Sequence, residues 1–319
     1  MKLFCVFLLL FFAFVKSYSQ IVEFPDSLFK EKLLNHDPVI DLNNDGEIQL
    51  AEAKSFDGLM NLTDINPLIT DLSGIEAFIN IIGLDCRANP ITTIDLQYNT
   101  ALRYLDCSYT NVSIVNVSQC KSLEEIYIDH TEILFLNLTN NPTLRKVYLR
   151  NNLLIELDLS HNTQLESVHL GYNLLLSLDL RNGNNTHIDS NSFFIANNDF
   201  LGCVFVDDSQ YSSSNWIFKD PTTTYVETQE ECDKLGISDY SKANFTIFPN
   251  PVNNRLTFYS ESLSEKEIQI FDIYGKLLSE TKASGASISI DFSRYPIGVY
   301  YAIVTEGKKN VIQKKIIKK

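Results

Sequence analysis

A period of 21 residues in the middle of the chain limits the possible folds more than any other feature of the sequence. Shifting the sequence by this step aligns apolar residues in six columns over five units. A single unit cannot bury its own apolar side, so successive units have to stack and share one core. The repeat therefore predicts a solenoid. Two of its inward columns are Leu84, Leu105, Ile126, Val147, Val168 and Cys86, Cys107, Ile128, Leu149, Leu170.

The repeated unit reads L-x-L/C-x-x-N/T-x-I-x-x-L-x-L and resembles the leucine-rich repeat. Asn89, Asn152 and Asn173 occupy the asparagine position of that motif, whereas Thr110 and Thr131 depart from it. Each unit is expected to add one short parallel strand to a concave sheet. A second extended segment of the unit should lie on the opposite side of the stack.

The repeats are predicted to cover residues 63–188, with a weaker unit at 65–81 before the regular set. A sixth strand is predicted after a fifteen-residue insertion, because Leu201, Val204 and Val206 repeat an apolar pattern seen 36 residues earlier. An open stack exposes its first and last units, so caps are expected at both ends. We assign residues 20–62 to the N-terminal cap, 189–232 to the C-terminal cap and 233–244 to a linker.

The first nineteen residues, 1–19, have the features of a secretory signal peptide. Lys2 and Lys16 flank an apolar run, and small residues precede Gln20, the expected first residue after cleavage. No other stretch approaches the roughly 20 apolar residues that a transmembrane helix needs. The formal net charge of −14 makes nucleic acid an unsuitable partner. The sequence thus predicts an exported chain without a transmembrane segment.

Residues 41–52 match the calcium loop of the EF-hand at each ligand position. Gly46 stands where that loop makes its tight turn, and Pro38 interrupts the helix predicted before it at 27–34. We therefore expect an EF-hand-like loop with a structural calcium ion, the alternative being an acidic turn that binds no metal. The predicted ligands are Asp41, Asn43, Asp45, the Glu47 carbonyl, Gln49 through water, and Glu52.

The cysteines fall into two groups. Cys203 and Cys232 bracket the region where the period is lost, and a disulfide between them would hold a covering segment over the last unit of an exported protein. Two free thiols are the alternative. Cys86 and Cys107 share an inward column and are interpreted as small apolar residues of the core. Cys120 has no predicted role and falls in a column with Asn99, Asn141 and Asn162.

From residue 245 the pattern changes to short alternating strands, which predicts a small β-sandwich. Four motifs occur in order: FPNPVNNRLTF, IQIFDIYGKLL, YPIGVYYAIV and VIQKKIIKK. With them, residues 245–319 resemble the C-terminal sorting domain of the type IX, or Por, secretion system of Bacteroidetes. The resemblance implies export by the type IX machinery, removal of this domain, and attachment to the outer-membrane surface or release. An ordinary adhesive β-sandwich is the alternative interpretation. The strands are predicted at 246–248, 256–259, 268–273, 287–292, 298–305 and 310–317.

No catalytic constellation is found in the sequence. The five histidines lack metal-binding spacing, and no glycine-rich phosphate loop is present. We therefore predict that the chain is not an enzyme.

Alternation along the strands assigns one outward column of the concave sheet to aromatic residues, namely Tyr127, Tyr148, His169 and Phe205. Strands lie about 4.8 Å apart, so these rings should be neighbours. Outward tyrosines also suit strands simply as β-forming residues. We predict that the column binds a protein or peptide, as in an adhesin, with a carbohydrate ligand as the alternative. Four further residues flank the column: Tyr104, Lys146, Arg150 and Asp129.

Overall fold

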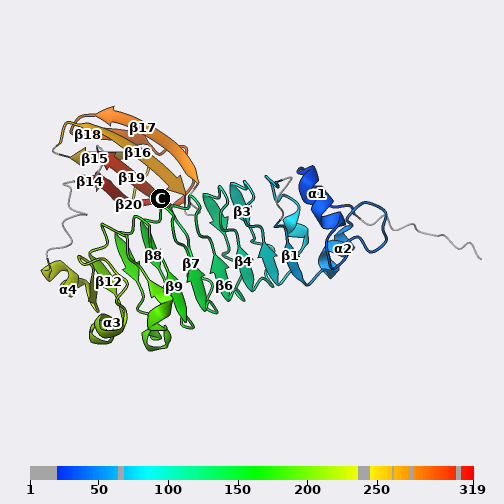
Figure 1. The fold of residues 1–319 in the computed structure, drawn as a ribbon. Coiled ribbons are helices and arrows are strands. Elements are labelled where there is room, and N and C mark those ends of the chain that lie inside the picture. Colours follow the sequence, from blue (N-terminus) through cyan, green and yellow to red (C-terminus); the bar gives the residue numbers. More distant parts are fainter. Residues whose placement is uncertain (1–19, 64–67, 236–244, 261, 273–275, 307–309) are drawn as a thin grey trace, which may run out of the picture.

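The computed structural model describes residues 20–63, 68–235, 245–260, 262–272, 276–306 and 310–319, without the side chains of 310–313. An elongated stack of short strands runs between two caps, and a C-terminal sandwich packs against its flank (Figure 1). The predicted signal peptide lies outside the described residues. Within them, no helix has the length and apolar character needed to cross a bilayer.

Each unit of the stack contributes a strand to a parallel sheet of seven strands. Its central residues pair in register from Leu84 to Val168, as the 21-residue period predicts. These side chains are fully buried. The predicted leucine-rich-repeat-like solenoid is thereby confirmed. The order of strands is β1 (Leu59–Asn61), β2 (Gly83–Asp85), β4 (Tyr104–Asp106), β6 (Glu125–Tyr127), β7 (Lys146–Tyr148), β9 (Ser167–His169) and β11 (Phe193–Phe194).

The last strand of this sheet differs from the prediction. Phe193 of β11, and not Val204, pairs beside Val168. The insertion carries its own copy of the motif 25 residues after the preceding unit, with Phe193, Ile195 and Asn198 in the inward positions. The sixth strand predicted at Val204 was therefore wrong for this sheet. Val204 instead pairs with Leu178 on the flank of the solenoid.

The second extended segment forms strands on the flank in most units, as expected. Two short parallel sheets result, and no strand is assigned between them at residues 135–137. The first sheet pairs β3 (Thr93–Asp95) with β5 (Ile114–Asn116). The second contains β8 (Glu156–Asp158), β10 (Ser177–Asp179), β12 (Cys203–Phe205) and β13 (Thr224–Val226).

Buried asparagines connect neighbouring units inside the stack. The Asn152 amide donates to the Leu149 carbonyl at 3.1 Å, and the Asn173 amide donates to the same carbonyl at 2.8 Å. The Asn173 side-chain oxygen also accepts from the backbone N–H of Leu154 at 3.0 Å. Since buried backbone groups need partners, Asn152 and Asn173 close the turns of their units by pairing backbone groups that would otherwise be left without partners.

The N-terminal cap contains α1 (Ser27–Leu34), which confirms the predicted helix, and α2 (Leu50–Ser55). The short helix η1 (Ile75–Ala77) follows in the weaker first unit. Asp26 caps α1 by accepting from the backbone N–H of Leu28 and Phe29. Phe29 and Leu33 on the inner side of α1 are fully buried in the solenoid core. This cap therefore closes the apolar end of the first unit.

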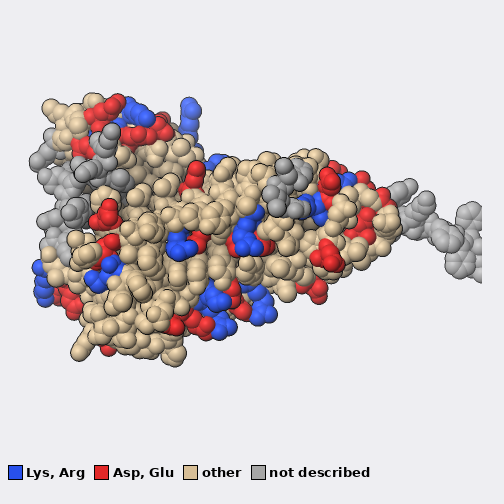
Figure 2. Space-filling model, in the orientation of Figure 1, with Lys and Arg blue, Asp and Glu red and all other residues tan. Residues whose placement is uncertain are grey.

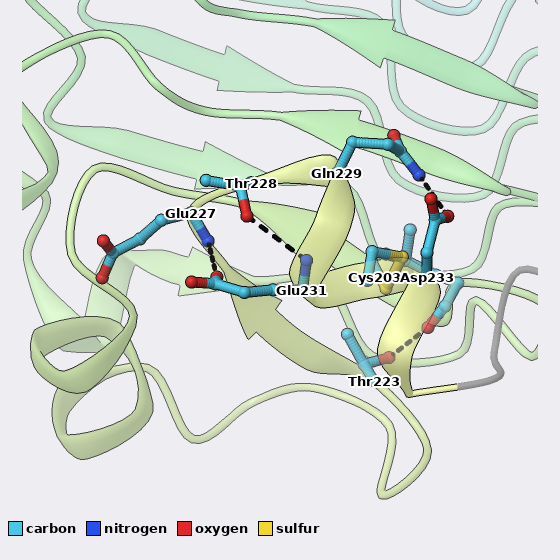
Figure 3. The surroundings of a disulfide bond; sticks show 9 residues. Cys203, Thr223, Glu227, Thr228, Gln229, Glu231 and Asp233 are labelled. Carbon is cyan, nitrogen blue, oxygen red and sulfur yellow. Dashed lines mark hydrogen bonds between the residues drawn. A yellow bond between two sulfur atoms is a disulfide. The ribbon is translucent and has the colours of Figure 1, made fainter.

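The C-terminal cap contains the short helix η3 (Ser190–Ser192), α3 (Ser209–Asn215) and α4 (Gln229–Lys234), which extends past the predicted end at residue 232. The short helix η2 (Asn185–His187) lies just before the cap. Trp216 is fully buried and stacks on Phe193 with a centroid distance of 4.1 Å. The predicted disulfide between Cys203 and Cys232 is present and ties α4 to β12 (Figure 3). Thr228 caps α4 by accepting from the backbone N–H of Glu231.

Residues 245–319 form an antiparallel sandwich of two sheets. One sheet contains β14 (Phe245–Phe248), β15 (Arg255–Ser260) and β18 (Ser287–Asp291). The strand β17 (Leu277–Ser284) was not predicted, because it is an edge strand whose side chains are partly or fully exposed and mostly polar. The other sheet contains β17 (Leu277–Ser284), β16 (Glu265–Asp272), β19 (Gly298–Glu306) and β20 (Asn310–Lys318).

Candidate functional site

The outward face of the seven-stranded sheet carries a continuous row of aromatic rings. Tyr127 and Tyr148 have a centroid distance of 4.9 Å, and the ring of Tyr148 stacks on that of His169 at 4.4 Å with an interplanar angle of 13°. The row continues at both ends with distances of 5.6 to 6.5 Å. We call it the aromatic ladder, and its members are Tyr104, Tyr127, Tyr148, His169, Phe194 and Phe218.

Phe205, predicted to belong to this row, does not lie in it. Its strand β12 pairs in the flank sheet, and its ring is 9% exposed in a cluster with the Cys203–Cys232 disulfide. Phe194 takes the predicted place instead, because β11 follows β9 in the sheet. Gly171 makes room for this ring, since a Cβ atom there would lie 2.1 Å from the Phe194 ring.

Charged residues beside the ladder are already paired with one another. Lys146 Nζ lies 3.0 Å from Glu125 Oε1, and Arg150 Nε lies 3.5 Å from Asp129 Oδ2. The Tyr127 hydroxyl donates to Glu125 at 2.8 Å. Over the middle of the solenoid, positive and negative groups lie next to one another (Figure 2). The sheet face therefore carries little unbalanced charge near the ladder.

A second charged group lies at the N-terminal end of the ladder. Arg87 Nη2 is 2.8 Å from Asp85 Oδ2, and Arg87 Nε is 3.3 Å from Asp106 Oδ2. Burial raises the pKa of the Asp106 carboxyl. A shallow depression of about 340 Å³ lies beside the ladder residue Tyr104 and is lined by Leu59, Ile82, Gly83, Arg103, Tyr104, Glu124 and Glu125.

The pKa values of three ladder residues are shifted toward the uncharged form. Burial raises the pKa of Tyr127, and the adjacent Glu125 carboxylate raises it further. Burial also raises the pKa of Tyr104 to about 12. Burial lowers the pKa of His169, and the positive charge of Arg150 lowers it further. These shifts keep the Tyr104 and Tyr127 phenols protonated and the His169 imidazole neutral, so these rings repel neither one another nor an apolar ligand.

A second outward column, not predicted from the sequence, lies in the turn that follows each strand of the sheet. Its residues all have left-handed backbone conformations, with φ between 54° and 65°. Tyr109 and Tyr172 are 61% and 53% exposed, and the Tyr109 ring stacks on that of His130 at 4.5 Å. The 21-residue spacing from Ala88 to Tyr172 could have revealed this column in the sequence. We call it the turn column, formed by Ala88, Tyr109, His130, Asn151, Tyr172 and Asn197.

The predicted calcium loop has the backbone expected of its motif. Gly46 has φ +80°, and its N–H donates to Asp41 Oδ2 at 2.9 Å. Asp45 Oδ1 accepts from the Glu47 N–H at 2.9 Å, and Glu52 Oε2 accepts from the Gln49 N–H at 2.8 Å. Across the described part of the chain, however, no group of three or more His, Cys, Asp or Glu side chains is arranged to hold a metal ion. Calcium thus stays a prediction.

Comparison with known proteins bears first on the C-terminal sandwich. Residues 246–319 match the model of the secretion system C-terminal sorting domain, which confirms the resemblance seen in the sequence. Ulvan lyase NLR42 of Nonlabens ulvanivorans is 31% identical over 88 residues, which make up 27% of this chain. The matched part is 16% of the length of that lyase.

Solved structures with a related arrangement include two internalins. The functional domain of InlJ from Listeria monocytogenes is 18% identical, with a TM-score of 0.44, over 86% of this chain and 60% of that one. The internalin InlF from the same organism is 13% identical, with a TM-score of 0.27, over 68% of this chain and 82% of that one. Similarity at this level is not evidence of a shared function. The solenoid assignment rests on the strand pairings given above.

The two parts of the molecule now have separate assignments. The parallel strands, their 21-residue period and the buried asparagines define the leucine-rich-repeat solenoid. The matched tail defines the route of export. The chain therefore combines a leucine-rich-repeat-like solenoid with a type IX sorting domain, which indicates a secreted or outer-membrane surface location.

Proposed function

We propose that the outward face of the seven-stranded sheet binds an extracellular protein or peptide, and that the chain is a binding protein rather than an enzyme. The aromatic ladder carries this proposal. Its rings lie outside the solenoid core, which aliphatic columns such as Ile126 and Val147 already fill. Tyrosine and other aromatic residues dominate the central contacts of protein interfaces. A continuous row of them is therefore suited to an extended partner.

The stacking of the rings favours a protein ligand over a carbohydrate. Tyr148 and His169 are almost parallel at 4.4 Å, so each covers one face of the other. A sugar ring stacks on an open aromatic face, whereas the edges presented by this ladder suit contacts with side chains. The similarity to an ulvan lyase involves a sixth of that protein and gives its named activity little support here.

The turn column supports the same proposal. Placing a residue that has a Cβ atom in the left-handed conformation costs about 1–2 kcal/mol of conformational free energy. Glycine and asparagine tolerate this conformation best. Tyr109 and Tyr172 nevertheless occupy such positions while largely exposed to solvent. These rings contribute little to the core, so a role in contacts with a partner accounts for them better than a role in folding.

A binding screen with matched variants tests this proposal. The full chain is screened against secreted proteins, synthetic peptides and a glycan array. The double variant Tyr127→Ala/Tyr148→Ala should weaken binding to a protein or peptide hit by about 2 kcal/mol, or roughly 30-fold. Tyr98→Ala is the control, because Tyr98 is exposed and lies outside the ladder. Normal binding by the double variant would contradict the proposal, and hits confined to glycans would favour a carbohydrate ligand.

We also propose a structural calcium ion at the loop formed by residues 41–52. The observation that favours it is the burial of the Asp41 and Glu52 carboxylates, which backbone N–H groups of the loop hold in place. An ion that binds only the folded chain stabilises it by about 2.7 kcal/mol at 100 times its Kd. Adding about 1 mM calcium to chelator-treated protein should raise the Tm. Asp45→Ala should lose this response and Asp57→Ala should keep it. An equal response in both would place the effect elsewhere.

A further inference from the structure

The flank of the solenoid carries apolar residues that the repeat does not require. In the first two units one outward position holds Thr92 and Ser113, and the next position begins with Thr93. In the following three units the first position holds Leu134, Ile155 and Leu176, although it points away from the shared core. The second position continues as Ile114, Phe135, Glu156 and Ser177, so Phe135 is its apolar residue in these three units. We call the apolar group the flank patch, and it consists of Leu134, Phe135, Ile155 and Leu176.

The sorting domain covers this patch. The ring of Phe135 lies 5.4 Å from that of Phe271 and stacks on that of Tyr301 at 5.0 Å. Ile155 is 1% exposed and Ile303 is 4% exposed within the same apolar cluster. Figure 1 shows the sandwich lying along β8 and the neighbouring units.

The matching surface of the sorting domain is also unusual for a sandwich. Along β19, Tyr300, Ala302 and Val304 face the interior of the sandwich. Tyr301 and Ile303 alternate with them and so lie on the outer face, where a sheet exposed to water carries polar residues. Two surfaces that both depart from their expected polar character therefore meet each other.

The contact has the layout of a specific interface. Its centre is the apolar cluster, and polar residues of both parts line a cleft of about 570 Å³ at its edge. Among them are Asn137, Asp158 and Asp179 of the solenoid and Lys315 of the sorting domain. An apolar centre with a polar rim is the usual organisation of protein interfaces.

We propose that the flank patch is a docking site for the sorting domain of the same chain. A short connection between two parts of one chain gives each part an effective concentration in the millimolar range near the other. Even a weak interface between them therefore stays formed while the chain is intact. The docked domain lies on the flank strands and leaves the aromatic ladder uncovered. This inference does not depend on the proposed ligand of the sheet face.

The test uses the full chain and returns the flank to the residues of the earlier units. The triple variant Leu134→Thr/Phe135→Thr/Ile155→Ser copies Thr92, Thr93 and Ser113, so the solenoid should still fold. We expect a larger radius of gyration in small-angle scattering and at least tenfold faster amide exchange in the segment that contains Tyr301. The control variant Thr92→Ser/Ser113→Thr should match the wild type, because it changes the same column in units that the sorting domain does not cover.

Unchanged scattering and exchange in the triple variant would overturn the proposal. If the triple variant does not fold its repeats, the variant Tyr301→Thr tests the same interface from the sorting domain. A larger radius of gyration in this variant supports docking, and an unchanged radius overturns it.

Discussion

The sheet face and the flank of the solenoid both depart from a polar surface, but in different ways. On the sheet face the outward residues are aromatic, stack on one another and remain partly open to solvent. On the flank they are mostly aliphatic and another part of the same chain covers them. In a solenoid the inward columns repeat because every unit needs a core. Outward positions are free to vary, so their departures from the repeat indicate contacts with something else.

The largest expected effect is a loss of stability on truncating a core residue, and it distinguishes inward from outward residues of the same strand. Ile126→Ala should lower the free energy of unfolding by about 2–5 kcal/mol, because the side chain is fully buried and its loss leaves a cavity. The neighbouring Tyr127→Ala should cost about 1 kcal/mol, the scale of an aromatic pair. Urea unfolding followed by circular dichroism measures both. Equal losses in the two variants would contradict the distinction between core columns and the sheet face.

An intermediate effect concerns Cys120, which interrupts a column of buried asparagines on the flank. Asn141 donates to the carbonyls of Val117 and Cys120 at 3.0 and 2.8 Å. The Cys120 thiol has one weak donor and lies 3.4 Å from the Leu96 carbonyl. Cys120→Asn should therefore stabilise the chain by about 1 kcal/mol. Thermal unfolding checks this, with Cys120→Ala as the control, and a destabilised Cys120→Asn variant would show that the column does not accept an amide there.

The smallest expected effect is the pH dependence contributed by His169. Its pKa in the folded chain is lowered by burial, so the unfolded chain takes up the proton first as the pH falls. The stability linked to His169 is complete above about pH 6.5, the ordinary histidine value, and declines below it. His169→Gln should therefore reduce the loss of Tm between pH 7.5 and 5.5. The exposed His161→Gln serves as control, and an unchanged loss in His169→Gln would contradict the assignment.

Local spacing was sufficient to predict most of the solenoid. The columns through Leu105 and Ile126 predicted which residues pair and which are buried, because each unit contacts only its neighbours. The disulfide between Cys203 and Cys232 followed from their position at the end of the array. Five strands of the sheet, from β2 to β9, were predicted for the same reason, and with them Tyr127, Tyr148 and His169 of the aromatic ladder. The first strand, β1, lies in the predicted N-terminal cap and was not predicted.

Tertiary structure alone decided where the period changes and which surfaces meet. A step of 25 residues places Phe194 beside His169, whereas the sequence pattern favoured Phe205. Docking of the sorting domain joins Phe135 to Tyr301, which are far apart in the chain and belong to different patterns. A periodic sequence specifies contacts between adjacent units, because the same spacing repeats them. Contacts between an insertion or a second domain and the stack depend on the shape of both surfaces, and no repeat encodes that shape.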